Sequence, residues 1–241
     1  MRIHSKSDKG PVRNTNQDAF SAIEFESKAT FAVVCDGMGG ANAGNVASET
    51  AVKRICDYIY RSYRTDMDNF EIEKLLKNAI VSANMEVYDM SLKNPELSGM
   101  GTTVVATLVR NGEAVIAHVG DSRAYLVDEK ITQLTRDHSV VQSLLESGKI
   151  TPEDAKVHPR KNVITRALGA EENVIVDIGQ LSLKAGQTLL LCSDGLSSFA
   201  ESEDILKVFK TTDEASVPEE LVKLAVRGGG GDNITVVTLS V

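Results

Sequence analysis

Four aspartates stand at the ends of apolar segments, each beside glycine or a small polar residue. Three of them follow such a segment, Asp36 in FAVVCDGMGG, Asp121 in AVIAHVGDSR and Asp194 in TLLLCSDGL, and Asp232 precedes one in GGGGDNITVV. A single aspartate at the end of a strand is an ordinary turn former. Four of them beside fully apolar strands indicate that, if the strands are neighbours, the carboxylates meet at one edge of the core.

Carboxylates gathered beside an apolar core are costly, because burial penalises the charged form and the low dielectric strengthens their mutual repulsion. Divalent cations between the carboxylates would remove that cost. A set of oxygen ligands without histidine or cysteine favours Mg²⁺ or Mn²⁺ over zinc. Glycine follows both Asp36 and Asp194, and glycine lets the backbone approach closely, so the Gly37 carbonyl is a further candidate ligand.

The segment RNTNQDAF near the N-terminus places Arg13 five residues before Asp18. A guanidinium group is a planar fork that binds phosphate in a bidentate way. Taken alone, an arginine and an aspartate at this spacing are more often a surface ion pair. Beside the four aspartates, Arg13 becomes a candidate phosphate-binding group.

Apolar runs rich in β-branched residues predict the strands that would position these side chains. The predicted strands are 19–25, 30–35, 102–110, 113–119, 123–127, 174–180, 188–192 and 234–241. Asn111-Gly112 is a strong turn signal because both residues tolerate positive φ, so 102–119 is expected to form an antiparallel hairpin.

Apolar residues at helical spacing predict the helices. The predicted helices are 45–63, 70–92, 140–147, 202–209 and 218–227, and the glycine run 228–231 ends the last of them. This order of elements suits an α+β domain in which helices pack on antiparallel sheets. The segment 139–169 has helix signals but little apolar periodicity, and we expect it to be a mobile surface flap.

Length, charge and cysteine content limit the classes of protein. The 241 residues show no internal repeat or linker, so a single domain over 1–241 is expected. A net charge of -8 without a Lys/Arg block argues against a nucleic-acid partner; metal-binding carboxylates and simple solubility explain the charge equally well. The cysteines lack a zinc spacing, no signal peptide opens the chain, and no apolar run approaches the roughly 20 residues that cross a bilayer. These features predict a reduced, cytoplasmic protein that does not enter membranes.

Eight segments, taken in order, resemble the metal-dependent PPM family of serine/threonine phosphatases, also called the PP2C-like family. They span 13–237 and read RNTNQDA, VVCDGMGG, GMGTTVVA, AHVGDSRAYL, LTRDHS, HPRKNVITRALG, LLLCSDGL and GGGDNITVV. One Asp-Gly pair would mean little, but the ordered set is specific. Gln17 before Asp18, the short length and the flap segment are most similar to the bacterial single-domain members.

The resemblance implies a four-layer α-β-β-α sandwich, in which two antiparallel sheets are flanked by helices and the site lies in a cleft at one end. By motif match, Asp36 would bridge two metal ions and the Gly37 carbonyl would ligate one of them. Asp194 and Asp232 would complete the ligands of the other. The implied cofactor is Mn²⁺ or Mg²⁺, with two ions per site and, as often in bacterial relatives, a third.

The same match gives roles to three more residues. Asp18 would hold a metal-bound water, Asp121 would ligate the third ion, and Arg13 would grip the substrate phosphate. The implied reaction is hydrolysis of phosphoserine or phosphothreonine in proteins by a bridging hydroxide that the metal ions activate, with Asp36 and Asp18 as the catalytic carboxylates. No protein nucleophile is required.

The resemblance also implies partners, namely phosphorylated proteins such as a cytoplasmic serine/threonine kinase and its substrates. No dimer signature is present, so a monomer is expected. In one position the chain departs from the eukaryotic branch: Met38 stands where a histidine is proposed to protonate the leaving group. An ordered or metal-bound water is our hypothesis for that acid, with His138 and His158 as less favoured candidates.

Two other functions would use the same residues. A binding module with this fold and no activity would typically have lost metal-site carboxylates, whereas every matched aspartate and Arg13 is present. A metal-dependent hydrolase of small phosphoesters would need the same site chemistry, so only substrate preference separates it from a protein phosphatase.

Overall fold

The computed structural model describes residues 1–40 and 43–241. Its strands form two antiparallel sheets. The first sheet contains β1 (Arg2–Asp8), β7 (Arg123–Val127), β8 (Ile131–Gln133), β10 (Thr188–Cys192) and β11 (Ile234–Ser240). The second contains β2 (Asp18–Glu24), β3 (Thr30–Met38), β4 (Gly101–Thr102), β5 (Val104–Arg110), β6 (Glu113–Val119) and β9 (Asp177–Ser182).

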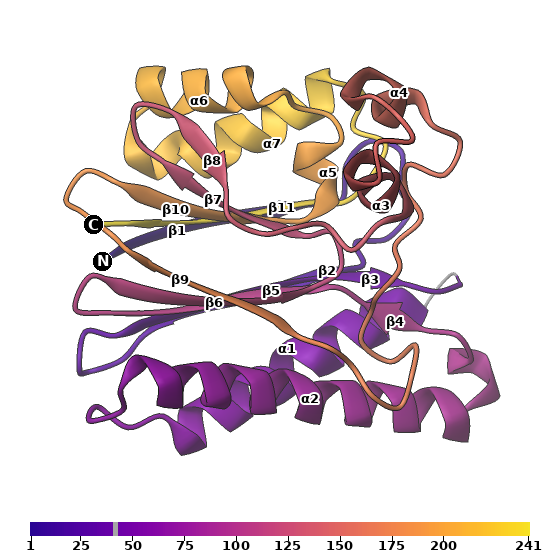
Figure 1. Ribbon diagram of the computed structural model, residues 1–241, viewed down its shortest axis with the longest axis horizontal. Helices are drawn as coiled ribbons and strands as arrows, with labels where there is room; N and C mark the ends of the chain where they lie inside the picture. The colour runs from indigo at the N-terminus through magenta and orange to yellow at the C-terminus, as the bar shows by residue number, and fades with distance from the viewer. Residues whose placement is uncertain (41–42) are drawn as a thin grey trace.

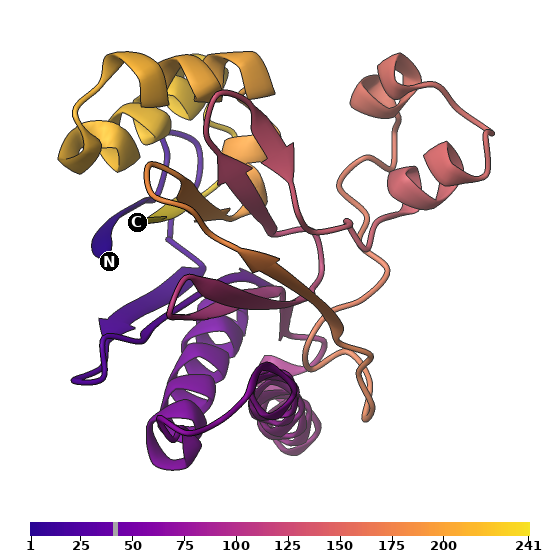
Figure 2. The same cartoon turned by 60° about the vertical axis from the view of Figure 1, so that its left-hand side comes forward.

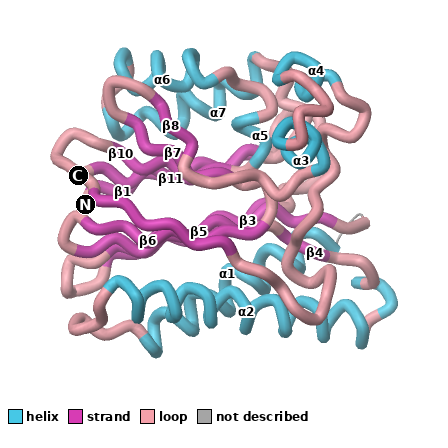
Figure 3. Tube along the Cα trace, in the orientation of Figure 1, coloured by secondary structure: helices cyan, strands magenta, loops and turns pink. Residues whose placement is uncertain are grey.

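Helices cover the outer side of each sheet. The helices of the described residues are α1 (Ala43–Ser62), α2 (Asn69–Lys93), α3 (Val140–Glu146), α4 (Pro152–Val157), α5 (Asp194–Ser197), α6 (Ser202–Thr211) and α7 (Val217–Arg227), with 3₁₀ turns at Pro95–Leu97 and Glu214–Ser216. Of these, α1, α2, α6 and α7 cover the sheets, and α3 and α4 belong to the flap segment. The strand orders are β1-β11-β10-β7-β8 and β2-β3-β5-β6-β9, and β4 pairs with β3. The sheets lie face to face, with α1 and α2 below one and α6 and α7 above the other (Figures 1 and 3). The predicted four-layer α-β-β-α sandwich is confirmed.

The sequence of strand β3 is apolar on both faces because both faces are buried. Phe31, Val33 and Cys35 pack against the helices α1 and α2, whereas Ala32 and Val34 face the other sheet. Successive side chains in a strand point to opposite sides, so a strand in the middle of this sandwich is buried on both. A third apolar cluster joins the first sheet to α6 and α7.

The predicted hairpin at 102–119 is confirmed, with one interruption. Strands β5 and β6 pair from Val104↔Val119 to Arg110↔Glu113, and Asn111 and Gly112 both have positive φ in the turn. The predicted first strand of the hairpin is interrupted at Thr103. Thr102 belongs to β4, which pairs with β3, and Val104 begins β5. Strand β9 begins at Asp177, later than the predicted 174.

Besides the two 3₁₀ turns, four elements of the described residues were not predicted, namely β1, β8, α4 and α5. Strand β1 has the polar sequence RIHSKSD and is an edge strand that pairs only with β11, so its exposed positions carry no apolar pattern. Strand β8 has three residues and α4 has six. Elements this short leave little periodicity for a sequence to show.

The flap segment 139–169 contains α3 and α4, and neither helix has a buried residue. Figure 2 shows the two helices standing away from the body of the sandwich. Across residues 1–40 and 43–241, no helix combines the length and the apolar character needed to cross a bilayer.

The side chain of Asn84 on α2 holds the loop that follows the flap. Its Nδ2 donates to the carbonyls of Glu171 and Glu172 at 3.1 and 2.9 Å, and its Oδ1 accepts from Gly169 N at 2.9 Å. Asn84 is fully buried. These three bonds satisfy the buried N–H of Gly169 and two carbonyls of the adjoining turn, so the loop depends on one side chain.

We predict that Asn84→Ala destabilises the protein by roughly 2–4 kcal/mol, because it leaves buried backbone groups without partners. Thermal unfolding should show a fall in Tm of about 5–15 °C. Asn69→Ala is the matched control, since Asn69 makes one long surface bond of 3.4 Å to Gln180. Equal Tm values for the two variants would contradict the assignment of Asn84 as the anchor of this loop.

Candidate metal centre

The two sheets bring the predicted aspartates together at one end of the sandwich. Asp18 on β2 lies directly opposite Asp36 on β3. Asp194 begins α5 immediately after β10, and Asp232 lies two residues before β11, which pairs with β10. The charges of Asp18, Asp194 and Asp232 all act on Asp36. The structure therefore places carboxylates from both sheets in one cluster.

Burial changes the acidity of these carboxylates. It raises the pKa of Asp36 well above the ordinary value, and the negative charges of Asp18 and Asp194 raise it further. Burial also raises the pKa of Asp18 to about 7 and, together with the charge of Asp232, that of Asp194 to about 6. Without a cation, the cluster is therefore unfavourable in its fully charged form.

The donors around the cluster test whether a cation fits. Asp18 Oδ1 and Asp194 Oδ1 are buried and have no hydrogen-bond partner. Asp232 differs, because its Oδ2 accepts from Arg13 Nη2 at 2.7 Å and its Oδ1 from Asn233 N at 2.8 Å. Carboxylate oxygens can accept more than one partner. A set of oxygen atoms with unused lone pairs suits a hard divalent cation such as Mg²⁺ or Mn²⁺.

The hydroxyl groups of two threonines fix the backbone at Asp36. Asp36 N donates to Thr103 Oγ1 at 3.0 Å, and Thr102 Oγ1 donates to Asp36 O at 2.9 Å. Thr103 Oγ1 also lies 2.6 Å from Ser122 Oγ, so it connects Asp36 with the residue after Asp121. The two threonines therefore have a structural role, which is to hold β3 beside β4 and β5.

Gly37 lies where β3 meets the start of α1. A Cβ at Gly37 would lie 2.0 Å from the Gly44 carbonyl oxygen and 2.7 Å from that of Gln17. Only glycine allows this approach. Any side chain at position 37 would therefore displace the backbone that carries Asp36.

Ser193 is a site residue that sequence reasoning missed. Its Oγ donates to Asp18 Oδ2 at 2.7 Å and accepts from Thr235 N at 3.0 Å. Ser193 is fully buried and links Asp18 in one sheet to β10 and β11 in the other. The only signal in the sequence is a small polar residue immediately before Asp194, and that signal does not reveal a partner 175 residues away.

Asp121 lies near the cluster, in the loop between β6 and β7, and its charge acts on Asp36. Burial and the charge of Asp194 raise its pKa to about 7. It borders a cleft of about 330 Å³ that runs from Asp121 and Asp194 to the flap. The cleft wall includes Arg123, whose guanidinium binds the Asp137 carboxylate in a bidentate way at 2.6 to 3.1 Å.

The two histidines considered as acids lie in different surroundings. His138 is buried, and both of its ring nitrogens have partners, Gly120 N and Asp177. His158 is at the end of α4 in the flap, and its Nδ1 accepts from Arg160 N at 3.1 Å. The partners of His138 leave no free nitrogen to protonate a leaving group.

Comparison with known proteins gives a consistent result. A family model described as protein phosphatase 2C matches residues 12–225. The serine/threonine phosphatase stp of Listeria innocua is 42% identical over 240 residues, which cover 98% of this chain and 94% of that protein.

Two solved structures have the same fold. The serine/threonine phosphatase Stp1 from Staphylococcus aureus superposes with a TM-score of 0.93 at 34% identity, over 99% of this chain and 94% of that one. The catalytic domain of the serine/threonine protein phosphatase PstP, in complex with two manganese ions, gives a TM-score of 0.86 at 35% identity, over 98% of this chain and 96% of that one.

The raised pKa of Asp18 predicts how the metal-free protein responds to pH. In the folded protein the neutral form is favoured up to about pH 7, against 3.8 for an ordinary aspartate. The contribution of Asp18 to stability is therefore fully present below pH 3.8 and is lost as pH rises through about 7. Asp18→Asn does not titrate, so in chelator its Tm advantage over wild type should grow between pH 5 and 8, reaching roughly 3–8 °C.

The control is Asp66→Asn, since Asp66 is 76% exposed and lies outside the cluster. Its Tm difference from wild type should not change with pH in this way. Adding Mn²⁺ should remove the advantage of Asp18→Asn, because a cation stabilises the charged wild-type carboxylate. A constant difference across the pH range in chelator would contradict the electrostatic cost assigned to Asp18.

Proposed function

The chain belongs to the protein phosphatase 2C family and is a protein-serine/threonine phosphatase, and we propose that it hydrolyses phosphoserine and phosphothreonine with divalent cations bound between its two sheets. The observation that carries this proposal is the pair of buried carboxylate oxygens, Asp18 Oδ1 and Asp194 Oδ1, that have no hydrogen-bond partner. Buried polar atoms are nearly always satisfied. A cation and the water bound to it would provide partners for both oxygens, the cation for Asp194 Oδ1 and the water for Asp18 Oδ1.

The proposed ligands follow from the cluster. Asp36 and the Gly37 carbonyl would hold one cation, and Asp36 together with Asp194 and Asp232 the other. Asp121 would contribute to a third. The ions would be Mn²⁺ or Mg²⁺, and the two manganese ions bound to PstP support a pair of them. When bound, such cations lower the pKa of water held at the site and offset negative charge on the phosphoryl oxygens.

The protein's own groups would orient the reactants. Ser193 fixes one oxygen of Asp18 at 2.7 Å, so the free oxygen Oδ1 is held in place to accept a hydrogen bond from water. Arg13 is half exposed at the rim, where its Nη2 binds Asp232 at 2.7 Å and its Nε donates to Gly231 O at 3.3 Å. From there its guanidinium would bind the phosphate of the substrate.

Three potential nucleophiles are buried beside the carboxylate cluster, and none of them is available for attack on phosphorus. The Ser193 hydroxyl is committed as a donor to Asp18 and an acceptor from Thr235 N. Burial raises the pKa of the Cys192 thiol to about 12 and that of Cys35 well above its ordinary value. Because neither thiol is ionised near neutral pH, water is the nucleophile that this site favours.

The cleft supports a protein as the substrate. It extends from Asp121 and Asp194 past α5 to the flap, with a volume of about 330 Å³, which leaves room for chain on one side of a phosphorylated residue. We infer that the partners are phosphorylated proteins, among them a serine/threonine kinase and its substrates, and that the enzyme acts as a monomer. The cysteines are all unpaired, which suits a reducing compartment such as the cytoplasm.

Asp36 provides the most direct test of the proposed function. Wild-type protein should release phosphate from a phosphothreonine peptide only when Mn²⁺ or Mg²⁺ is present. Asp36→Asn should lower kcat/KM by roughly 100-fold or more, because it weakens the ligand shared by both cations. Asp66→Asn, at an exposed aspartate paired with Arg64, should have no effect. Release that does not need a divalent cation, or an active Asp36→Asn variant, would overturn the proposed mechanism.

Arg13 tests the proposed binding of the substrate phosphate. Arg13→Ala should lower kcat/KM for the same peptide by roughly 10- to 100-fold, the value of a charged hydrogen bond to phosphate. Arg13→Lys should fall between, because lysine keeps the charge without the fork. Arg2→Ala, at an exposed arginine paired with Glu214, is the matched control. If saturating Mn²⁺ restores Arg13→Ala, the arginine serves only as counter-ion to Asp232.

A further inference from the structure

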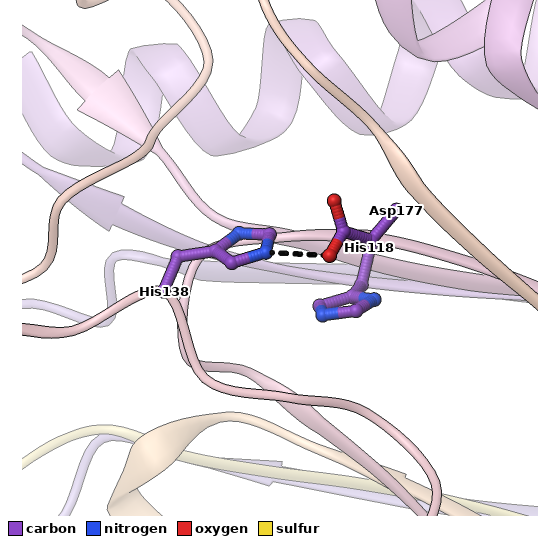
Figure 4. Close-up of side chains that lie close together, drawn as sticks. All are labelled: His118, His138 and Asp177. Carbon is purple, nitrogen blue, oxygen red and sulfur yellow. Dashed lines mark ion pairs between the residues drawn. The ribbon is translucent and has the colours of Figure 1, made fainter. Parts of the chain in front are cut away.

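Two buried histidines and an aspartate lie together beside the proposed site (Figure 4). His118 on β6 is directly opposite Asp177 on β9, and His138 enters from the segment before α3. The His118 and His138 rings stack with centroids 4.8 Å apart and planes inclined by 14°. His138 Nε2 lies 3.2 Å from Asp177 Oδ2, and only 2% of the His138 side chain is exposed. The proposed reaction gives this cluster no role.

The hydrogen bonds argue against a metal ion in this cluster, although the candidate ligand atoms lie within 4.8 Å of one another. Gly120 N donates to His138 Nδ1 at 3.0 Å. Because that nitrogen accepts, the proton of neutral His138 is on Nε2 and points to Asp177. A metal at Nε2 would require the proton on Nδ1, against the Gly120 N–H. Arg166 Nη1 lies 3.2 Å from the same Nε2 and 2.8 Å from Asp177 Oδ1, so it adds a competing positive charge where the metal would lie.

His138 is bonded to the loop that carries Asp121. Besides the side-chain contact, His138 N donates to Gly120 O at 2.9 Å. The residue immediately before Asp121 is thus held through both of its backbone polar groups by one histidine. Among the described residues, no other residue makes both a backbone and a side-chain hydrogen bond to Gly120.

His138 also joins the two ends of the flap. Thr165 N donates to His138 O at 2.7 Å, and Val140 N donates to Val163 O at 2.9 Å. Arg166, at the exit of the flap, binds Asp177 together with His138. We call the two ends, 137–140 and 163–166, the flap base. Helices α3 and α4 contain no buried residue and are tied to the body by the exposed ion pairs Arg136–Glu146 and Lys156–Glu201, so the flap base provides the buried attachment of this segment.

We propose that His138 is a positioning residue that couples the flap base to the Asp121 loop, so that the flap and the proposed third cation site hold their positions together. The part of this inference that concerns cations rests on the proposed role of Asp121. Asp177 and Arg166 orient the His138 ring so that Nδ1 faces Gly120. His118 supports the ring by stacking, while its own Nε2 lies 2.9 Å from Arg136 O.

Two substitutions separate the two sides of the His138 ring. In His138→Asn, Oδ1 stands near the position of Nδ1 and can still accept from Gly120 N. In His138→Gln, the amide reaches toward Asp177 and the acceptor for Gly120 is lost. Mn²⁺ binding to the full-length protein, measured by calorimetry, should show one step that Asp121→Asn removes. We expect His138→Gln to weaken that step by roughly 10- to 100-fold, and His138→Asn to stay close to wild type.

Limited proteolysis without metal gives a second readout, in which His138→Gln should speed cleavage within 141–162. His118→Gln is the matched control, because it disturbs the same buried cluster without touching Gly120. Thermal unfolding identifies any variant that has simply failed to fold, and His138→Asn then provides the rescue. In the Asp121→Asn background, His138→Gln should cause no further loss of Mn²⁺ binding.

The outcomes separate this inference from the proposed function. If His138→Gln and His138→Asn bind Mn²⁺ alike, or if the effect of His138→Gln is unchanged in the Asp121→Asn background, the coupling is refuted. It is also refuted if Asp121→Asn removes no binding step. Wild-type protein that fails to release phosphate with Mn²⁺ would refute the proposed function, while the Mn²⁺ titrations would still decide the role of His138.

Discussion

The repulsion between carboxylates in a low-dielectric setting is the constraint on which the rest of this structure depends. Burial is the largest cause of the raised pKa of Asp18, Asp36 and Asp194, and the charge of Asp232 raises the pKa of all three further. Hydroxyl donors such as Ser193 offset only part of this cost. The positive side chains nearby, Arg13 and Arg123, lower the pKa of Asp194 only as the smaller causes. The site is therefore under strain that a proton or a cation must relieve.

A carboxylate cluster with that electrostatic cost stays together only where the surrounding backbone cannot move apart. Asp36 lies on the central strand β3 and Asp194 follows the central strand β10, and both faces of these two strands are buried. Thr103 and Ser193 then lock the backbone and the side chains from opposite sheets. Moving Asp36 away from Asp18 would break an antiparallel pair and open the core. The free energy of packing the sandwich thus maintains an arrangement that electrostatics alone would disperse.

The sequence predicted what depends on local pattern and missed what depends on distant partners. Central strands and long helices were predicted because burial of one or both of their faces leaves an apolar pattern in the sequence. The candidate aspartates were then found at the ends of those apolar segments. The polar edge strand β1 was missed because one neighbour and partial exposure leave no such pattern. Ser193 and the His118–His138–Asp177 cluster were missed for another reason. Their roles arise from contacts between residues far apart in the chain, and a lone serine or histidine has many ordinary uses.

The flap and the carboxylate cluster are attached to the sandwich in different ways, and this difference has a functional consequence. The outer part of the flap contacts the α6 side through an ion pair between Lys156 and Glu201, with both side chains more than half exposed. Such a pair contributes about 0–1 kcal/mol. The outer flap can therefore change position at little cost, whereas its base is held by buried hydrogen bonds to Gly120 and Asp177. A substrate that displaces the outer flap would leave Asp36 and Asp194 in place and would affect the reacting groups only through His138 and Asp121. Under the proposed function, the chain would combine a fixed reaction centre with a wall that can adjust, and His138 would lie at the boundary between them.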